Sequence, residues 1–317
     1  MNIGIDAMGG DFAPETTVKG AIKAIQEFPP ESTITLYGDK DKIEAILSNE
    51  QANFDKINIV HTSQVIGMGD HPVKTFTRNP DSSIAVGFKD LAQGKIDGFA
   101  SAGNTGAMLV GAMHTVQQIP GIIRPCITGP LPKMGGGTNI LLDVGINPDC
   151  KPDVLYQYAI LGSLYAEHVH NINNPRVALL NIGEEEEKGN LLTSATHKLM
   201  KDSSDFNFVG NIEGNKLFYD DISDVVVTDG FSGNIVLKEA EAFYTLIKKR
   251  GLSDEYFDRF NPEIYGGTPI LGVNSTVLIG HGASNDIAIK NMILHTLHVA
   301  EAKLSEKIKE ALKHVKN

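Results

Sequence analysis

The chain has 317 residues, of which 41% are hydrophobic, so it is long enough to bury a large core and we expect a folded globular protein. Acidic residues number 39 against 28 Lys and Arg, and the resulting net charge of −11 argues against a nucleic-acid-binding protein, which needs clustered positive charge. The two cysteines, Cys126 and Cys150, lack the spacing of a metal site or a disulfide framework and are typical of a reducing compartment.

The first residues do not resemble a targeting segment. They contain no basic stretch followed by a long apolar run, and the acidic residues Asp6 and Asp11 come early. No apolar run elsewhere approaches the roughly 20 residues that a membrane-spanning helix needs. We therefore expect a cytoplasmic protein.

Apolar runs alternate with amphipathic segments in the first third of the chain. The predicted strands there cover residues 3–6, 33–37 and 57–60, and the predicted helices cover residues 14–27, 41–47 and 82–91. Residues 61–81 are polar and contain Gly and Pro, so we expect a long loop that serves as a lid or binding segment.

The same alternation continues to the C-terminus. Further strands are predicted at residues 96–100, 139–144, 177–181, 206–209 and 224–227, with helices at 152–170 and 285–316, the last of which could be a helix pair. This order predicts an α/β fold with a doubly wound, largely parallel sheet in an α/β/α sandwich. We expect residues 1–317 to form one catalytic unit with a cleft, from which residues 239–265 project as a helical arm.

One loop pattern, Ser/Thr-x-Gly-x-Thr/Ser-Gly, occurs twice. It is seen in Ser101-Ala-Gly103-Asn104-Thr105-Gly106 and in Thr228-Asp-Gly230-Phe-Ser232-Gly233, and residues 280–285 form a third candidate loop. Each loop precedes a predicted helix, whose first N–H groups and dipole favour an anion. A single glycine loop could be only a tight turn, but the repetition favours anion binding. A side chain at Gly106 or Gly233 is then expected to obstruct the anion's approach.

Several common catalytic motifs are missing from the sequence. It contains neither a G-x-x-x-x-G-K-[ST] loop nor a G-x-G-x-x-G after the first strand, where Met8-Gly9-Gly10-Asp11 ends in a carboxylate. It also lacks H-E-x-x-H and G-x-S-x-G, so we expect no metal, no cofactor and no serine nucleophile. We interpret the two cysteines as buried apolar residues in preference to thiol nucleophiles. The acidic run at residues 184–187 fits a solvated helix start better than a metal site.

Motifs along nearly the whole chain resemble those of one family, the soluble phosphate acyltransferases of bacterial phospholipid synthesis. The opening Asp6-Ala-Met-Gly-Gly-Asp11 is highly specific. The other matching motifs, in order, are Ser101-Ala-Gly-Asn-Thr-Gly106, Leu142-Asp-Val-Gly145-x-Asn147, Asn181-Ile-Gly-Glu-Glu-x-x-Lys188-Gly189, Thr228-Asp-Gly-Phe-Ser-Gly-Asn234, Tyr265-Gly-Gly267 and His281-Gly282.

The resemblance implies transfer of a fatty acyl group from acyl carrier protein to inorganic phosphate, without a cofactor. It also implies a homodimer, a fold like that of phosphate acetyltransferases and isocitrate-type dehydrogenases, and delivery of the acyl phosphate to a membrane glycerol-3-phosphate acyltransferase. Two features depart from the family. Asn79-Pro80-Asp81 follows Arg78 where a basic pair is usual, and the arm is shorter than the one that is thought to touch the membrane in relatives.

Phosphate, whose second pKa is near 6, is already a competent nucleophile at neutral pH. It mainly needs placing beside the thioester, and proximity can supply roughly 7–11 kcal/mol of the barrier. We expect direct attack without an acyl-enzyme, with Asp6, Asn104, Asp229 and His281 as catalytic residues, His281 acting as donor to the leaving thiolate. The expected binding residues are Gly9, Gly10, Asp11, Lys74, Arg78, Ser101, Gly103, Thr105, Gly106, Asp143, Asn147, Lys188, Gly230, Ser232, Gly233, Asn234, Lys238, Gly282 and Ser284.

Two alternatives stay open at the level of sequence. The donor could be acyl-coenzyme A instead of acyl carrier protein, or the protein could be a non-catalytic module that binds phosphate or acyl phosphate. The basic run Lys248-Lys249-Arg250 on the arm could dock an acidic carrier protein or be a solvated helix end.

Overall fold

The computed structural model describes residues 1–51 and 55–313. Its chain divides into two compact units. The first comprises residues 1–118 and 262–305, and the second comprises residues 119–261 and the chain from residue 306. The expected single catalytic unit stays a prediction, because a division into compact parts does not decide whether catalysis needs both.

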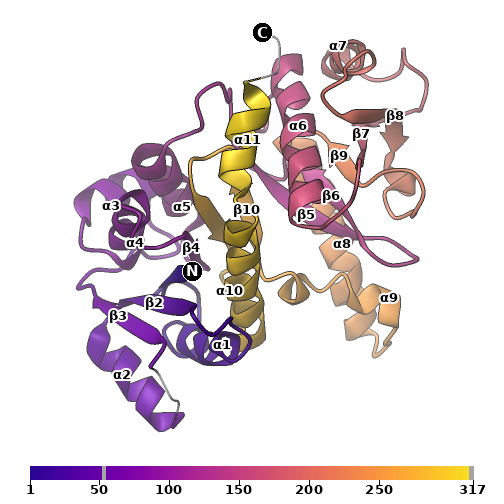
Figure 1. Cartoon of the computed structure of the whole chain (residues 1–317). Coiled ribbons are helices and arrows are strands. Elements are labelled where there is room, and N and C mark those ends of the chain that lie inside the picture. Colours follow the sequence, from indigo (N-terminus) through magenta and orange to yellow (C-terminus); the bar gives the residue numbers. More distant parts are fainter. Residues whose placement is uncertain (52–54, 314–317) are drawn as a thin grey trace. The chain divides into compact units, whose positions relative to one another are not determined.

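The first unit is built on strands in the order β3-β2-β1-β4-β11-β10. Figure 1 labels β2, β3, β4 and β10 among them. Neighbouring strands are parallel, except for the antiparallel pair β10–β11. The first three strands agree with the sequence-based prediction, whereas β10 and β11 were not predicted. The bounds are β1 (Asn2–Asp6), β2 (Thr33–Gly38), β3 (Ile57–His61), β4 (Gly98–Ser101), β10 (Thr268–Leu271) and β11 (Thr276–Ile279).

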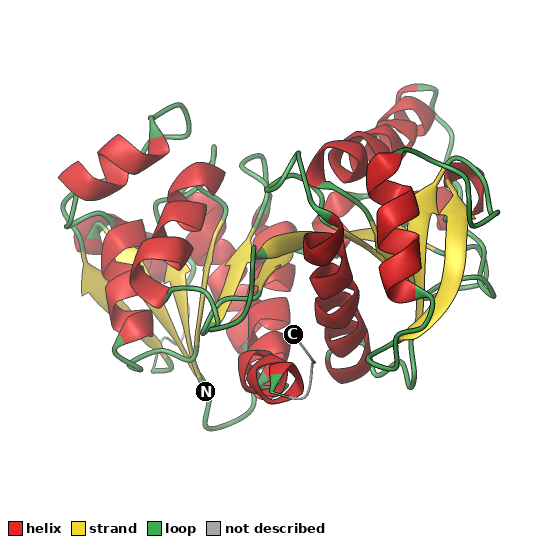
Figure 2. Ribbon diagram, turned by 90° about the horizontal axis from the view of Figure 1, so that it is seen from above, coloured by secondary structure: helices red, strands yellow, loops and turns green. Residues whose placement is uncertain are grey.

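Helices lie on both sides of these strands (Figure 2). Helix α1 packs against α10 so closely that a Cβ atom at Gly20 would lie 2.5 Å from Ile289 Cγ2. Helices α3, α4 and α5 form a second group of mutual contacts. The bounds are α1 (Glu15–Ile25), α2 (Lys40–Asn49), α3 (Pro72–Arg78), α4 (Ser83–Ala92), α5 (Thr105–Gly111), its π-helical continuation (Ala112–Val116) and α10 (Asp286–Glu301).

The second unit contains strands in the order β5-β6-β9-β7-β8, with only the pair β5–β6 antiparallel among those described. Their bounds are β5 (Cys126–Pro132), β6 (Thr138–Leu142), β7 (Arg176–Asn181), β8 (Asn207–Glu213) and β9 (Val225–Val227). The helices are α6 (Pro152–His168), α7 (Leu191–Met200), α8 (Gly230–Lys249) and α9 (Glu255–Asp258), and α11 (Leu304–Leu312) begins at the boundary between the units.

Alternating residues of β9 contact helices on the two faces of this sheet. A Cβ atom at Gly162 of α6 would lie 2.6 Å from Val225, so α6 covers one face closely. Val226 belongs instead to a core cluster that includes Ala240 of α8 and Phe260. Both sheets are therefore largely parallel with helices around them, and the predicted doubly wound α/β class is confirmed.

Three segments differ from the sequence-based expectation. Strand β5 was missed because Pro130 and Pro132 cannot donate ladder hydrogen bonds and make the run look like a loop. The predicted loop at residues 61–81 contains the short helix α3, which begins at Pro72. Residues 184–187 precede the first turn of α7 instead of forming a helix start.

The C-terminal segment forms two helices, α10 and α11, as one of the two expected arrangements. Among residues 1–51 and 55–313, none of the helices is both long and apolar enough to cross a bilayer. The arm expected at residues 239–265 comprises the end of α8, all of α9 and a 3₁₀ turn at Pro262–Ile264. Part of it packs on the second unit, since Tyr256 and Phe257 contact the core cluster.

A buried network of ion pairs, formed by Lys133, Arg176 and Asp224, lies at the amino end of β9. Lys133 and Asp224 are almost fully buried, and their side chains approach to 2.7 Å. Arg176 donates from Nε to Asp224 Oδ2 at 2.9 Å and from Nη2 to Oδ1 at 3.0 Å. Although burial alone would raise the pKa of Asp224, the hydrogen bonds with Arg176 and Lys133 outweigh it and hold that pKa well below its ordinary value.

This network predicts acid-sensitive stability of the second unit. A carboxylate whose pKa is lowered by folding stabilises the protein above its unfolded pKa of about 3.9, and this contribution is lost as pH falls through the folded pKa. Asp224→Asn leaves Lys133 without its buried partner and should lower the free energy of unfolding by about 3–5 kcal/mol at pH 7. In urea titrations, the difference from wild type should shrink below about pH 4. The exposed Asp202→Asn is the control, and an equal effect of both substitutions would contradict the assignment.

Candidate active site

Three loops of the first unit meet at one edge of its sheet. Strands β1, β4 and β11 are neighbours and parallel, so the segments that follow their carboxyl ends lie together. The backbone joins these segments directly: Asp11 N–H donates to Gly282 O at 2.8 Å, and Gly280 N–H donates to Ser101 O at 2.9 Å. The structure therefore brings together the Asp6, Ser101 and His281 loops that the sequence singled out.

Asp6 is buried at the centre of these loops. Its carboxylate accepts hydrogen bonds from Ser101 Oγ at 2.6 Å and from Met8 N–H at 3.0 Å, and Ser101 Oγ accepts one from Gly103 N–H at 2.8 Å. Burial raises the pKa of Asp6, although the hydrogen bond from Ser101 acts in the opposite direction. A Cβ atom at Gly9 would lie 2.3 Å from Asp6 Oδ2, so this position requires glycine. Asp6 and Ser101 thus fix the relative positions of two loops.

Asn104 links helix α5 to the preceding segment of the chain. Its Oδ1 atom caps α5 by accepting a hydrogen bond from Ala107 N–H at 3.0 Å. Its Nδ2 atom donates to the carbonyl oxygens of Gly67, Met68 and Asp70 at 3.0, 3.2 and 3.0 Å. The polar atoms of this side chain are therefore occupied by protein groups, and the expected catalytic role of Asn104 stays a prediction.

The segment 67–72 lies against the glycine loops. A Cβ atom at Gly106 would lie 2.8 Å from Pro72, and one at Gly282 would lie 2.5 Å from Met68 Cε. We expected a side chain at Gly106 to obstruct an anion, but the space it would occupy is already filled by Pro72. Lys74 and Arg78, the expected charge partners of phosphate, follow on α3 and are exposed.

In the second unit, Asp143 organises the turn after β6. This fully buried carboxylate accepts hydrogen bonds from the N–H groups of Ile127 at 3.1 Å, Ile146 at 3.1 Å and Asn147 at 2.6 Å. Asn147 Nδ2 donates to Pro125 O at 2.7 Å. Asp143 and Asn147 therefore hold the backbone of this turn.

The start of helix α8 packs directly on this turn. Gly230 N–H donates to Asn147 O at 2.8 Å, and Asn234 Nδ2 donates to Val144 O at 3.0 Å. A Cβ atom at Gly233 would lie only 2.0 Å from Asp143 O. Gly233 is thus required for the approach of helix to backbone, a different reason from the obstruction of an anion that we expected.

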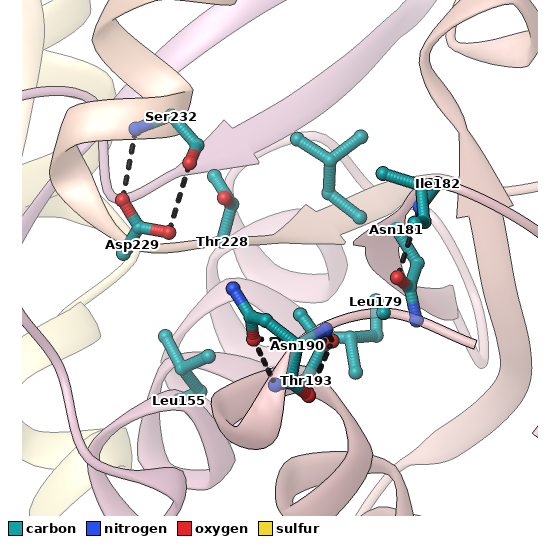
Figure 3. A pocket seen from close by; sticks show the side chains of 11 residues that line it. Leu155, Leu179, Asn181, Ile182, Asn190, Thr193, Thr228, Asp229 and Ser232 are labelled. Atoms are coloured by element: carbon teal, nitrogen blue, oxygen red, sulfur yellow. Dashed lines mark hydrogen bonds between the residues drawn. The ribbon is translucent and has the colours of Figure 1, made fainter. Parts of the chain in front are cut away.

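Asp229 caps α8 in the same place. Its carboxylate accepts hydrogen bonds from Ser232 N–H at 2.8 Å and from Ser232 Oγ at 3.0 Å (Figure 3). Thr228, Asp229 and Ser232 all line a pocket of about 350 Å³ at the carboxyl ends of β7 and β9. The remaining lining residues are Leu155, Leu179, Leu180, Asn181, Ile182, Gly189, Asn190 and Thr193.

Helix α7 contributes a second helix start to this pocket. Asn190 and Thr193 form a reciprocal capping box in which each side chain accepts a hydrogen bond from the other residue's backbone N–H (Figure 3). Asn181 Nδ2 donates to Lys188 O at 3.0 Å, which fixes the loop between β7 and α7. The pocket therefore collects two helix N-termini and several hydroxyl and amide groups at one place.

Several residues that we expected to bind substrate do not line this pocket. Lys238 Nζ lies 2.7 Å from Glu241 on the same helix, and Lys188 is exposed on the loop beside the pocket. His281 is exposed, and Ser284 is buried with its N–H bonded to His281 O at 3.0 Å. The binding roles assigned to the remaining loop residues, Gly10, Asp11 and Thr105, also stay predictions.

Sequence reasoning missed much of the pocket. Asn190 and Thr193 carry a helix-start signal that was readable, because a side-chain acceptor precedes an apolar run by the usual spacing. Leu155 and Leu179 carry no comparable signal, since their place in the lining follows from how α6 and β7 pack. Asn181 was identified as following a strand but was not assigned to the site.

Comparison with known proteins decides the family. A family model described as "Fatty acid synthesis protein" matches residues 1–307. The phosphate acyltransferase of Desulfitobacterium hafniense (strain DSM 10664 / DCB-2) is 41% identical, with 98% of each chain covered. The phosphate acyltransferase of Dictyoglomus turgidum is 39% identical, with 99% of this chain and 98% of the relative covered. The chain belongs to this phosphate acyltransferase family.

Solved structures support the fold. A phosphotransacetylase from Streptococcus pyogenes has a TM-score of 0.65 at 17% identity, with 95% of this chain and 94% of that chain covered. A branched-chain phosphotransacylase from Enterococcus faecalis V583 has a TM-score of 0.63 at 14% identity, with 96% and 99% covered. These likenesses agree with the doubly wound α/β architecture.

The surroundings of Asn104 predict that it fastens residues 67–72. Asn104→Asp keeps an acceptor for the cap of α5 but loses the amide donors, whereas Asn104→Ala loses both. Because each lost hydrogen bond costs about 0.5–1.5 kcal/mol, amide exchange in residues 67–72 should become roughly tenfold faster or more in both variants. Exchange at the start of α5 should rise only in the alanine variant. Unchanged exchange of residues 67–72 in Asn104→Asp would refute this role.

Proposed function

We propose that this phosphate acyltransferase moves a fatty acyl group from the thioester of acyl carrier protein to inorganic phosphate. The observation that carries the proposal is the pocket of the second unit, in which residues of the Thr228–Gly233 loop meet two helix N-termini at the carboxyl ends of parallel strands. Ligands of α/β proteins usually bind at the carboxyl ends of the parallel strands, and helix N-termini favour anions.

The pocket offers phosphate both hydrogen-bond donors and one carboxylate acceptor. The Thr228 hydroxyl and the Asn190 amide donate hydrogen bonds to phosphate oxygens, and the dipole of α8 favours their charge. The Ser232 hydroxyl, which donates to Asp229 Oδ2 at 3.0 Å, turns to phosphate when it binds. At neutral pH the dianion still carries one proton, and Asp229 accepts a hydrogen bond from that P–OH group. The remaining oxygens stay available as nucleophiles.

The reaction then needs one bond exchange. A phosphate oxygen attacks the thioester carbonyl carbon, the C–O bond forms and the C–S bond breaks. The proton that the phosphate dianion carried ends on the carrier thiolate, so the products are acyl phosphate and free thiol. The protein's contribution is to place phosphate beside the thioester.

The two cysteines support direct attack over an acyl-enzyme. Cys126 is fully buried, and burial raises the pKa of its thiol well above the ordinary value. Burial also raises the pKa of Cys150 to about 11, and its Sγ donates to Asn147 O at 3.4 Å. Both thiols are therefore protonated at neutral pH, and the thiolate needed for nucleophilic attack is scarce.

Partners and location belong to the same proposal. We include a homodimer, an encounter with membrane glycerol-3-phosphate acyltransferase, and a cytoplasmic location with peripheral contact at the membrane. For an acidic carrier protein, the exposed Lys249 and Arg250 at the end of α8 offer positive charge. Lys248 is less available, because it lies 2.6 Å from Asp258.

The proposal is tested by turnover of the purified protein with radiolabelled phosphate and palmitoyl-carrier protein, compared with palmitoyl-coenzyme A. We expect labelled acyl phosphate from the carrier-bound donor, with the same rate after dialysis against EDTA. A clear preference for acyl-coenzyme A would show that the donor is acyl-coenzyme A instead of acyl carrier protein. Binding of phosphate without turnover of either donor would indicate a non-catalytic module.

Direct transfer through the pocket predicts different outcomes for cysteine and serine substitutions. Cys126→Ala and Cys150→Ala should keep most of the activity. Ser232→Ala removes a hydrogen bond to a charged ligand, worth about 1.5–3 kcal/mol, and should lower kcat/KM for phosphate about 10- to 150-fold. Ser232→Thr, which retains the hydroxyl, should restore most of it. Loss of activity in a folded cysteine variant, with Ser232→Ala unimpaired, would overturn this mechanism.

A further inference from the structure

The pocket of the second unit is chemically divided. Its polar groups come from the starts of α7 and α8, whereas its apolar lining comes from Leu155 of α6 and from Leu179 and Leu180 of β7. Leu155 and Leu179 are 1% and 0% exposed, so they only back the pocket wall, whereas Leu180 is half-buried and offers apolar surface to the pocket. A ligand that fills the pocket must therefore combine a polar group with an adjoining hydrocarbon part.

Ile182 extends the apolar lining out to solvent. It lines the pocket, yet its side chain is 80% exposed, which is unusual for a large aliphatic residue. The backbone fixes this position, because Ile182 N–H donates to Asn181 Oδ1 at 2.9 Å (Figure 3). Asn181 Nδ2 in turn donates to Lys188 O at 3.0 Å. An apolar side chain is therefore held at the solvent-exposed part of the pocket lining.

We propose that Leu180 and Ile182, backed by Leu155 and Leu179, form the subsite for the acyl chain, and that Ile182 sets a preference for long-chain donors. The inference rests on the proposed function, which places the phosphate beside Thr228 and Ser232 of the same pocket. The carbons next to the thioester lie against Leu180. The rest of a long chain leaves the pocket across Ile182, which a short chain does not reach.

The test compares donors of two lengths on variants of an exposed residue, so loss of folding is not a concern. Ile182→Asn should lower kcat/KM for palmitoyl-carrier protein while leaving butyryl-carrier protein near its wild-type value. Each buried methylene is worth about fourfold, so loss of contact with one or two predicts a decrease of roughly 4- to 16-fold. Ile182→Leu should keep the long-chain preference. The matched control is Leu199→Asn on α7, a 48% exposed residue outside the set that lines the pocket.

Equal effects of Ile182→Asn on both donors, or none on either, would overturn the subsite. A second measurement separates this inference from the proposed function. A fluorescent long-chain fatty acid should bind wild-type protein and Leu199→Asn alike but bind Ile182→Asn more weakly. If turnover is absent while this difference holds, the transfer reaction fails and the acyl subsite stands. If all three proteins bind the probe equally, the subsite is wrong whatever the turnover shows.

Discussion

In the second unit, the buried carboxylate of Asp143 accepts hydrogen bonds from three backbone N–H groups, on Ile127, Ile146 and Asn147. A buried charge is tolerated only when hydrogen bonds replace its lost hydration, and here the bonds come from the turn itself. The turn then receives α8, since Gly230 donates to Asn147 O and Gly233 lies against Asp143 O. The start of α8 and the pocket that it lines depend on this arrangement.

The first unit uses the same physical solution with different residues. Asp6 binds Ser101 Oγ and the Met8 N–H, and Asn104 joins α5 to three carbonyl groups of residues 67–70. In both units the acidic and amide side chains that drew notice in the sequence are engaged in holding loop backbone. These contacts hold the backbone donors and the helix starts of the loops in place.

Features of the site that depend on local sequence could be predicted, whereas features that depend on packing could not. Strand ends followed by glycine loops are local features, so the Asp6, Ser101, Asp143 and Thr228 loops were found. Asn104 and Asp229, which we expected to be catalytic, cap α5 and α8. Pocket lining is a property of packing, so Leu155 and Leu179 could not be found. The contacts of Gly106 with Pro72 and of Gly233 with Asp143 O were equally invisible, because each joins segments that are distant in the sequence.

Direct attack of phosphate on the thioester is the central claim, and isotope exchange tests it most directly. Isotopically labelled carrier protein with a free thiol is incubated with the enzyme and unlabelled palmitoyl-carrier protein, with and without phosphate, and the acylated carrier is analysed by mass spectrometry. Direct attack predicts that label enters the acylated carrier only when phosphate is present, through reversal of the reaction. Exchange at the same rate without phosphate would reveal an acyl-enzyme and contradict this account.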